Sequence, residues 1–402
     1  MVDIVCLLPF LFFALYLAFL TMLAAFQKMK PVGKMPARFR RFAVIVPAHN
    51  EESGIEPTLR SLLAVDYKRD RFDVVVIADN CTDRTAEIAR AAGVRVLERT
   101  DRVLRGKGYA IKWCMEKLTG AEEEYDAFVI VDADSVVTEN TLKVLNSYLE
   151  DGADCIQISD MVTPQPGAWS PEMIRVAFIL HNYVRPLGRK AIGFGPGLNG
   201  NGMCFSSRLL KEKPWNSFSR AEDLERYLQL TLDGVGVWFA PEAVVYATMP
   251  TDSASAKSQR KRWEMGRLPL IRKYAGSLLM ATLRRKSLVA LDVLIELMTP
   301  AFVNMFALTL LAFLVNALFV AVGAAWLILP AAAWGAAVLL ELFHVFGGLR
   351  AANADRDAYA ALMNLPKYAV WKVGLYVKTI FKGDDKEWIR TARRRVEREN
   401  NG

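Results

Sequence analysis

The chain has 402 residues, 53% of them hydrophobic, and a formal net charge of +8, which allows one large domain or two modest ones. Its basic residues flank apolar tracts and gather near the C-terminus without a recognised nucleic-acid motif. This pattern excludes a nucleic-acid-binding protein and is typical of the cytoplasmic side of a membrane protein. Five cysteines without a C-x-x-C pair indicate reduced thiols, and three histidines exclude a His-rich metal centre.

The first predicted element is a membrane-spanning helix over residues 4–26, within an N-terminal segment 1–27. Its roughly 23 apolar residues are enough to cross a bilayer. Asp3 precedes the helix, whereas basic residues follow it from Lys28 onward. The positive-inside rule therefore predicts an N-terminus outside and a cytoplasmic chain after Lys28. A secretory signal peptide would carry its positive charge first.

Residues 40–275 form the predicted soluble domain, in which strands alternate with helices. The strands are uniformly apolar, as expected when a parallel sheet is buried on both faces. This order predicts an α/β fold with a doubly wound, mostly parallel sheet, whose ligands gather at the carboxyl ends of the strands. The strands are predicted at 42–46, 74–77 and 127–131, and the helices between them at 55–64, 82–92 and 107–118.

Two residues near these strand ends can contact a nucleotide. Asp79 follows the second strand, where it can accept hydrogen bonds from a nucleobase; the alternative is an Asx turn, because Asp79-Asn80 is a good turn former. Lys107 opens a helix from a glycine-flanked loop, where backbone N–H groups also favour anions. For this lysine the alternative is a solvated loop.

Asp132 and Asp134 follow the third strand. Alternate residues of an extended chain point the same way, so both carboxylates can face one ion. Hard oxygen ligands of this kind suit Mg²⁺ or Mn²⁺. The alternative is a solvated pair of aspartates ahead of a helix at Thr138.

Two later segments are candidates for the acceptor side. The glycine-rich segment 193–202 lacks the Lys-Ser/Thr ending of a phosphate-binding loop, and its glycines let the backbone approach a ligand closely. We expect it to form a wall of the site. Glu222 and Asp223 directly precede a helix predicted over 224–232. There they act as a helix cap, as a general base for an acceptor hydroxyl, or as both.

Residues 259–263 read Gln-Arg-Lys-Arg-Trp. Arginine grips phosphate bidentately, and the indole of Trp263 offers a flat face for a sugar ring. We expect this segment to lie on a helix at the cytoplasmic membrane surface.

The C-terminal part is again typical of a membrane protein. No charged residue or histidine occurs from Leu297 to Leu340, so segment 288–346 predicts two crossings joined by a turn near Gly323. Glu341 and His344 follow, and we interpret them as interfacial side chains near water in preference to a buried functional pair.

The last segment, 360–402, predicts an amphipathic interfacial helix and a basic tail. Aromatic residues alternate with lysines between Leu365 and Phe381, as in helices that lie among lipid headgroups. The basic residues after Trp388 favour attraction to membrane lipids over a catalytic role.

Taken in order, these motifs resemble the family 2 glycosyltransferases, and in particular the membrane-embedded branch of cellulose, chitin and hyaluronan synthases. The resemblance implies a GT-A fold, a UDP-sugar donor, a Mg²⁺ or Mn²⁺ ion and inversion at the anomeric carbon. It covers about residues 40–275 and rests on Val46-Pro47-Ala48-His49-Asn50-Glu51, Asp79, Asp132-x-Asp134, Glu222-Asp223 and Gln259-x-x-Arg262-Trp263.

The resemblance also implies a role for each residue. Asp223 is the base, with Glu222 beside it, and Asp134 coordinates the metal together with Asp132. Trp263 stacks on the acceptor sugar. The residues on the donor side are Pro47, Asn50, Glu51, Asp79, Lys107, Asp132 and Arg262, and those on the acceptor side are Trp263, Gln259, Asn199 and Gly200.

The function predicted from the sequence is extension of a polysaccharide at the cytoplasmic face of the plasma (inner) membrane, together with export or assembly partners. The alternative is transfer of a single sugar to a membrane lipid. Ceramide glucosyltransferase-like enzymes have a similar basic-Trp element, and three helices form a poor polymer channel. A third reading, a non-catalytic scaffold of an export complex, is disfavoured because every expected carboxylate is present.

Overall fold

The computed structural model describes residues 2–29, 36, 38–119, 124–249 and 253–365, with only the backbone of 253–265. These residues form two compact units. One contains residues 2–28, 164–194 and 291–365; the other contains the described residues between 29 and 163 and between 195 and 290. The predicted domain limits remain a prediction, and residues 164–194 group with the apolar helices.

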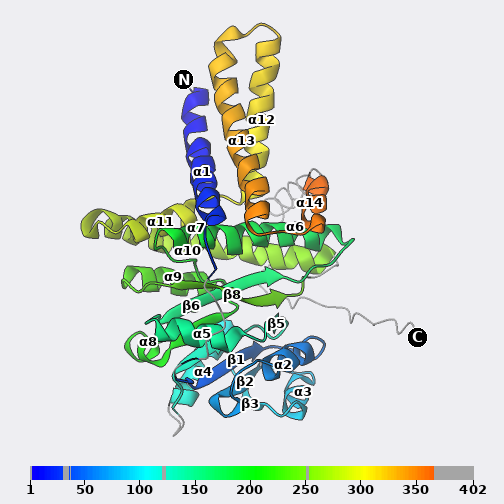
Figure 1. The fold of residues 1–402 in the computed structure, drawn as a ribbon, viewed down its shortest axis with the longest axis vertical. Helices are drawn as coiled ribbons and strands as arrows, with labels where there is room; N and C mark the ends of the chain where they lie inside the picture. Colours follow the sequence, from blue (N-terminus) through cyan, green and yellow to red (C-terminus); the bar gives the residue numbers. More distant parts are fainter. Residues whose placement is uncertain (1, 30–35, 37, 120–123, 250–252, 366–402) are drawn as a thin grey trace. The chain divides into compact units, whose positions relative to one another are not determined.

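The second unit is built on one sheet. Its strands are β1 (Phe42–Ala48), β2 (Phe72–Asp79), β3 (Arg95–Arg99), β4 (Ala127–Ile130), β5 (Ser135–Val137), β6 (Cys155–Val162), β7 (Met203–Ser206) and β8 (Trp238–Ala247). In the described part of the chain they follow the order β3-β2-β1-β4-β7-β6-β8-β5 (Figure 1). Strands β1 to β4 pair in parallel, as do β6 and β8, whereas β7 is antiparallel to β4 and β6 and β5 to β8. The α/β prediction is confirmed, and the three predicted strands are the neighbours β2, β1 and β4.

The helices predicted between these strands are also confirmed. They are α2 (Ile55–Leu63), α3 (Thr85–Ala91) and α4 (Lys107–Thr119). Helix α3 begins three residues later than predicted, because residues 82–84 form hydrogen bonds to the loop after β1. The unit also contains η1 (Arg69–Arg71), α5 (Thr141–Glu150), α8 (Ser207–Glu212), α9 (Glu222–Leu232) and α10 (Ser253–Arg285).

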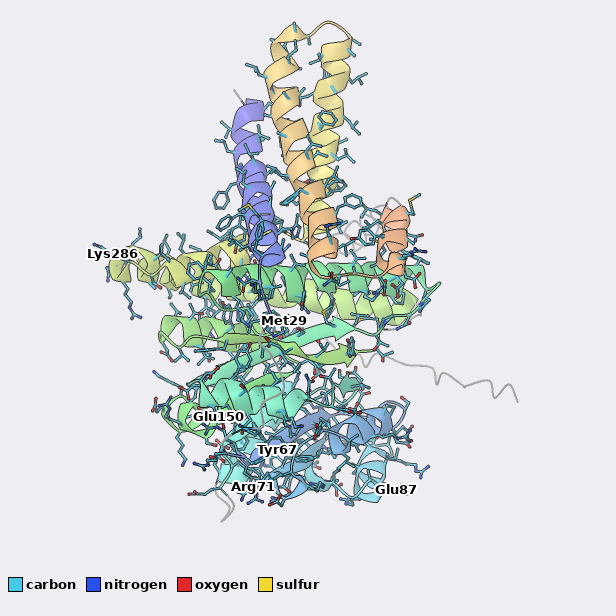
Figure 2. The ribbon with its side chains drawn as sticks, in the orientation of Figure 1. Met29, Tyr67, Arg71, Glu87, Glu150 and Lys286 are labelled. Carbon is cyan, nitrogen blue, oxygen red and sulfur yellow. The ribbon has the colours of Figure 1, made fainter. Side chains whose placement is uncertain are left out.

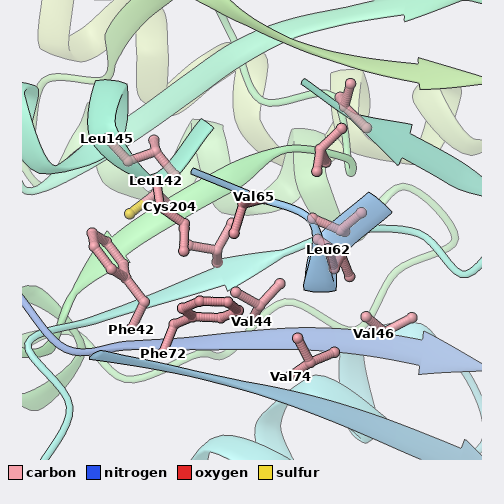
Figure 3. Close-up of a cluster of buried hydrophobic side chains, with 14 of the residues drawn as sticks. Phe42, Val44, Val46, Leu62, Val65, Phe72, Val74, Leu142, Leu145 and Cys204 are labelled. Carbon is pink, nitrogen blue, oxygen red and sulfur yellow. The ribbon is translucent and has the colours of Figure 1, made fainter. Parts of the chain in front are cut away.

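The core that positions the strand ends lies between the sheet and helices α2 and α5. Phe42, Val44 and Val46 of β1 alternate toward it, and their register partners on β2 include Phe72 and Val74 (Figure 3). Full burial of each such side chain stabilises the fold by about 1.5–3 kcal/mol. The alternation fixes the register, so the polar residues after β1 and β2 emerge at one edge of the sheet.

A polar cluster fixes the start of β1. The hydroxyl of Tyr67 donates to Asn146 Oδ1 at 2.9 Å, and Asn146 is fully buried. A carboxylate oxygen of Glu150 accepts from the Arg38 backbone N–H at 3.1 Å, and Figure 2 labels both Tyr67 and Glu150. These bonds hold the chain before the strand, so the strand's far end, which carries the site, is also held in register.

The first unit consists of helices. They are α1 (Val2–Ala25), α6 (Trp169–Phe178), the π-helical segment η2 (Ile179–Val184), α7 (Arg185–Ala191), most of α11 (Leu288–Met298), α12 (Phe302–Ala321), η3 (Ala325–Leu327), α13 (Ile328–Ala351), α14 (Arg356–Ala361) and η4 (Leu362–Asn364). Among the described residues, three helices are long and apolar enough to cross a membrane: Val5–Ala25, Phe302–Ala321 and Ala325–Ala351. They match the predicted pattern of one N-terminal and two C-terminal helices. The predicted turn is at Gly323, which adopts a φ of +102°, a conformation that glycine reaches without steric cost.

The prediction that Glu341 and His344 lie near water is wrong. Both residues are fully buried. Glu341 accepts a hydrogen bond from Thr309 of α12, and His344 Nδ1 lies 2.6 Å from Thr21 Oγ1 of α1. The sequence spacing of α13 does not reveal these partners, because they come from two other helices. The amphipathic helix and basic tail were predicted over 360–402. Residues 360–364 belong to α14 and η4, and the residues from 366 onward lie outside the described part of the chain.

Candidate active site

The end of β2 presents a buried carboxylate. Asp79 is 8% exposed, and its Oδ1 accepts from Arg99 at 2.7 Å and from Asn80 Nδ2 at 3.0 Å. The alternative expected here was an Asx turn at Asp79-Asn80. Asp79 is the last residue of β2, and Asn80 after it adopts a left-handed conformation with φ of 52°. Arg99 is a residue that sequence reasoning missed. Its position as a charged residue at the end of the amphipathic run 95–99 was the feature of the sequence that could have identified it.

The loops after β1 and β2 are joined to each other. Pro47 lies in β1 opposite Ile77 of β2. Asn50 Oδ1 accepts from the Thr82 backbone N–H at 2.7 Å, and the Glu51 N–H donates to Thr85 Oγ1 at 2.8 Å. The predicted donor-side residues Pro47, Asn50 and Glu51 therefore lie in one connected loop pair, beside the strand that carries Asp79.

Lys107 joins three of the predicted segments. Its Nζ lies 2.6 Å from Asp132 Oδ1, 2.6 Å from the Gly200 carbonyl oxygen and 3.7 Å from Glu222 Oε1. Burial opposes its charge, but the carboxylates of Asp132 and Glu222 outweigh burial and raise the pKa of Lys107 above its usual value. The solvated-loop alternative does not describe this lysine, whose side chain is 25% exposed.

Asp132 and Asp134 occupy a turn instead of an extended strand. Strand β4 ends at Ile130, and the Ser135 N–H donates to the Asp132 carbonyl at 3.2 Å. Both aspartates are half-buried, whereas Ala133 between them is buried. The strand predicted at 127–131 ends one residue early, at Ile130, so the two aspartates do not lie on the extended strand that was expected, although both carboxylates keep access to solvent.

The turn offers two carboxylates to a metal ion, those of Asp132 and Asp134. Within the described residues, no group of three or more His, Cys, Asp or Glu side chains is placed to hold an ion. Mg²⁺ is commonly held by one or two carboxylates, with substrate phosphates and water completing its shell. The turn of Asp132 and Asp134 fits an ion bound in that way, and does not fit an all-protein cage.

The glycine-rich segment forms a wall against the predicted base. Gly200 has φ of +80°, and a Cβ added there would lie 2.9 Å from Asp223 Oδ2. The segment is held by buried amides: Gln157 Oε1 accepts from the Asn199 N–H at 3.0 Å, and Asn201 Oδ1 accepts from the Asp132 N–H at 3.1 Å. Glycine at 200 thus allows the backbone to approach the carboxylate.

Glu222 and Asp223 lie in the first turn of α9, which begins at Glu222, two residues before the predicted start. Asp223 Oδ1 accepts from the Leu224 N–H at 2.7 Å, while residue 221 supplies no side-chain cap. Burial raises the pKa of Glu222 to about 7, against the opposing effect of Lys107. Burial also raises the pKa of Asp223.

Asp160 is a second residue that sequence reasoning missed. It lies on β6, is 5% exposed, and accepts from Asn201 Nδ2 at 3.3 Å. Burial, followed by the charge of Asp132, raises its pKa well above the usual value. The signal in the sequence was a lone carboxylate inside the largely apolar run 155–162.

The remaining predicted residues, Gln259, Arg262 and Trp263, lie on α10, where only the backbone is described. Gly266, one turn after Trp263, packs against the residue before Glu222. A Cβ added to Gly266 would lie 3.3 Å from Ala221 Cβ. Helix α10 therefore passes directly beside the start of α9. The structure groups Lys107, Asp132, Gly200, Glu222 and Asp223 at one centre.

Two curated relatives illustrate the sequence similarity of this chain to known proteins. A Bacillus subtilis (strain 168) protein called probable glycosyltransferase YdaM is 24% identical over 263 residues, covering 62% of this chain and 60% of that protein. A beta-monoglucosyldiacylglycerol synthase from Nostoc sp. is 24% identical over 233 residues, covering 56% of this chain and 48% of that protein. The chain thus spans about half to three-fifths of the length of these curated relatives.

A solved structure shares the fold over nearly the whole chain. It is a mannosyltransferase from Pyrobaculum calidifontis in complex with GDP-Man and Mn²⁺, with a TM-score of 0.56 and 16% identity, covering 95% of this chain and 99% of that one. The family model described as glycosyltransferase like family 2 matches residues 39–266, more than half of the chain. The chain therefore belongs to glycosyltransferase family 2 and has a GT-A-type fold.

Proposed function

We propose that this enzyme moves one sugar from a UDP-sugar to a hydroxyl group of a membrane lipid, with inversion and with a divalent metal ion. The observation that carries the proposal is the centre around Lys107, where a cation, a carboxylate turn, the buried carboxylate of Glu222 and the half-buried carboxylate of Asp223 converge. Such a centre meets the two needs of the reaction, namely charge stabilisation on the leaving diphosphate and a base for the acceptor.

Asp223 is the proposed base. A general base works best when its pKa lies near the operating pH, and burial moves the pKa of Asp223 in that direction. Its Oδ1 is fixed by the Leu224 N–H, and its Oδ2 faces Gly200. One carboxylate that takes the acceptor proton requires no covalent intermediate, so the acceptor oxygen attacks the anomeric carbon from the face opposite the diphosphate. The result is inversion.

The leaving diphosphate needs positive charge. Lys107 supplies one cation at the centre, and Arg262 on α10 is the proposed second cation. Asp134, with Asp132, would hold Mg²⁺ or Mn²⁺, which when bound neutralises charge on the diphosphate. Trp263, with Gln259, Asn199 and Gly200, is the proposed acceptor side, since α10 packs on Ala221 next to the base.

The donor base is proposed to contact the buried carboxylate of Asp79, which Arg99 orients. Pro47, Asn50 and Glu51 shape the neighbouring loop. The fold relative from Pyrobaculum was solved with GDP-Man, so a donor screen must include GDP-mannose beside the UDP-sugars.

Two observations support a lipid acceptor. The Nostoc relative is named for a glucosylated diacylglycerol. Among the described residues, three helices qualify as membrane spans, a small number from which to build a polymer channel. Polysaccharide extension, with export partners, is the second candidate, supported by the resemblance of the Gln259–Trp263 motif to the polymer synthases. In both cases we place the catalytic unit on the cytoplasmic side of the inner membrane, with the N-terminus outside.

The test uses the full chain in lipid nanodiscs with UDP-glucose, UDP-GlcNAc, UDP-galactose and GDP-mannose, each with Mn²⁺ or Mg²⁺. Nucleotide release and product mass are measured with and without diacylglycerol. We expect a single added sugar on the lipid; a ladder of sugars would favour the polymer. Asp223→Asn should reduce turnover by at least about 100-fold, whereas Asp70→Asn, an exposed site, should not. Equal turnover in Asp223→Asn and wild type would overturn the role of Asp223.

A further inference from the structure

A second groove is lined by other residues of the helices that carry the centre. It has a volume of about 540 Å³, within the range of about 300–1,000 Å³ typical of small-ligand sites. Helices α4 and α9 contribute Lys112, Arg226 and Gln229, and the segment after α8 contributes Lys213 and Trp215. None of these residues takes part in the proposed transfer.

Arg226 is the unusual residue of this groove. It is 3% exposed, and its guanidinium donates to the carbonyls of Pro214 at 3.0 Å and Lys213 at 2.5 Å. Its charge lies 5.8 Å from the ring centre of Trp215. No described carboxylate forms an ion pair with it, and the Nε atom is buried without a hydrogen-bond partner.

A buried cation without a counter-ion is costly, so it is rarely kept for stability alone. Burial accordingly lowers the pKa of Arg226. The nearest acid lining the groove is engaged elsewhere, because Asp233 pairs with Lys213 at 3.3 Å. With Lys112 and Glu212 included, three cations and two carboxylates line the groove, which leaves an excess of one positive charge.

The rest of the lining fits the polar part of a sugar. Asn216 and Gln229 offer amide groups, and the Lys112 ammonium is 41% exposed. Gln229 Nε2 already donates to the Asn216 carbonyl at 2.9 Å, which holds this wall in place. Amides beside cations are suited to hydroxyl groups next to an anion.

We propose that this groove binds a phosphorylated sugar, whose phosphate supplies the counter-charge that Arg226 lacks and lies beside the ammonium groups of Lys112 and Lys213, each of which has one carboxylate partner at more than 3 Å. The site is separate from the donor centre, although α9 carries both Asp223 and Arg226 and α4 carries both Lys107 and Lys112. The proposal goes beyond the proposed transfer reaction and does not depend on the identity of its donor or acceptor.

The test is calorimetric titration of the full chain in nanodiscs with glucose 1-phosphate, with inorganic phosphate and with glucose. We expect glucose 1-phosphate to bind more tightly than phosphate, and glucose to bind more weakly than either. The double variant Lys112→Ala/Lys213→Ala should weaken binding at least tenfold, while Lys211→Ala, an exposed lysine of α8 outside the groove, should not.

Arg226→Met should abolish binding; if that variant fails to fold, the lysine pair decides. Repeating the titration with saturating UDP separates the groove from the donor site. Binding that survives UDP but is lost in the lysine variant supports the groove. Displacement by UDP, or equal binding in all variants, overturns it. Vesicles with phosphatidylinositol phosphate form a second arm: preference for these vesicles over soluble glucose 1-phosphate would overturn the assignment to a soluble sugar phosphate.

Discussion

Replacing Lys107 with methionine should destabilise the protein more at pH 8 than at pH 5. The ammonium lies 2.6 Å from Asp132 Oδ1 and 3.7 Å from Glu222 Oε1, and Asp223 is also near enough to act on its pKa. Methionine keeps the length and removes the charge. The remaining carboxylates then face one another without a cation.

The expected loss of stability in Lys107→Met depends on how exposed the Lys107 and Asp132 side chains are. A hydrogen bond to a charged group contributes about 1.5–3 kcal/mol to stability. Because the Lys107 and Asp132 side chains are 25% and 37% exposed, we expect the lower end of this range, about 1.5 kcal/mol, at pH 8. The corresponding drop in Tm is roughly 3–6 °C.

The pH dependence has a definite sign. The folded pKa of Glu222, about 7, lies above its ordinary value of 4.5, so the folded state binds the extra proton between these values and stability falls as pH rises through this window. Lys107 lowers this pKa, so Lys107→Met should raise it further. At pH 5 Glu222 is protonated with or without the lysine, and the loss is smaller.

The assay is thermal unfolding in detergent at both pH values, with Lys112→Met as the matched control. Lys112 lies on the same helix, is 41% exposed and pairs only weakly with Glu116 at 3.7 Å, so its loss should cost under about 1 kcal/mol at either pH. An equal loss at pH 5 and pH 8 for Lys107→Met, after subtraction of the control, would refute the electrostatic reasoning.

Three further outcomes are expected. Gly200→Ala places a Cβ 2.9 Å from Asp223 Oδ2 at φ of +80°, so kcat should fall at least tenfold, whereas Gly234→Ala, at φ of +78° with open space around it, should cost stability of about 1 kcal/mol without loss of kcat. Mn²⁺ should bind at least ten times more tightly with UDP present than without it, because the described residues hold no three-ligand cluster; calorimetry that finds equal affinities would contradict the shared-ligand site. Arg99→Ala should raise KM for the donor more than it lowers kcat, since Arg99 orients Asp79 away from the reacting bond; the opposite split in steady-state kinetics would remove this role.

Three of the parallel strands, β1, β2 and β4, were predictable because they are buried on both faces. The runs at 42–46, 74–77 and 127–131 contain no charged residue. Each coincides with an observed strand whose ends differ from the predicted ends by no more than two residues. Strands β6 and β8 were not predicted, because β6 contains Gln157, Ser159 and Asp160 in its interior. These polar groups are tolerated there because each has a partner distant in sequence: Gln157 and Asp160 hydrogen-bond to Asn201, and Ser159 donates to the Pro241 carbonyl at 3.4 Å.

The candidate site was predictable by residue type and less so by geometry. Lys107, Asp132 and Asp223 were all named from the sequence, and they come together. Arg99 and Asp160 were missed because each acts through a partner distant in sequence, Asp79 and Asn201 respectively. Periodicity describes one element at a time, so it cannot report such pairs.

Asn50 shows how a motif residue can be needed for the backbone conformation. It adopts φ of 57°, and Asn80, after the neighbouring strand, adopts φ of 52°. Asparagine tolerates this left-handed region better than most residues. The Asn50 side chain is already used by the Thr82 N–H at 2.7 Å, and Asn80 Oδ1 accepts from the Asp101 N–H at 2.9 Å. Each asparagine therefore turns the chain sharply at a strand end and ties the turn to the next loop, which places Glu51 and Asp79 at the mouth of the sheet.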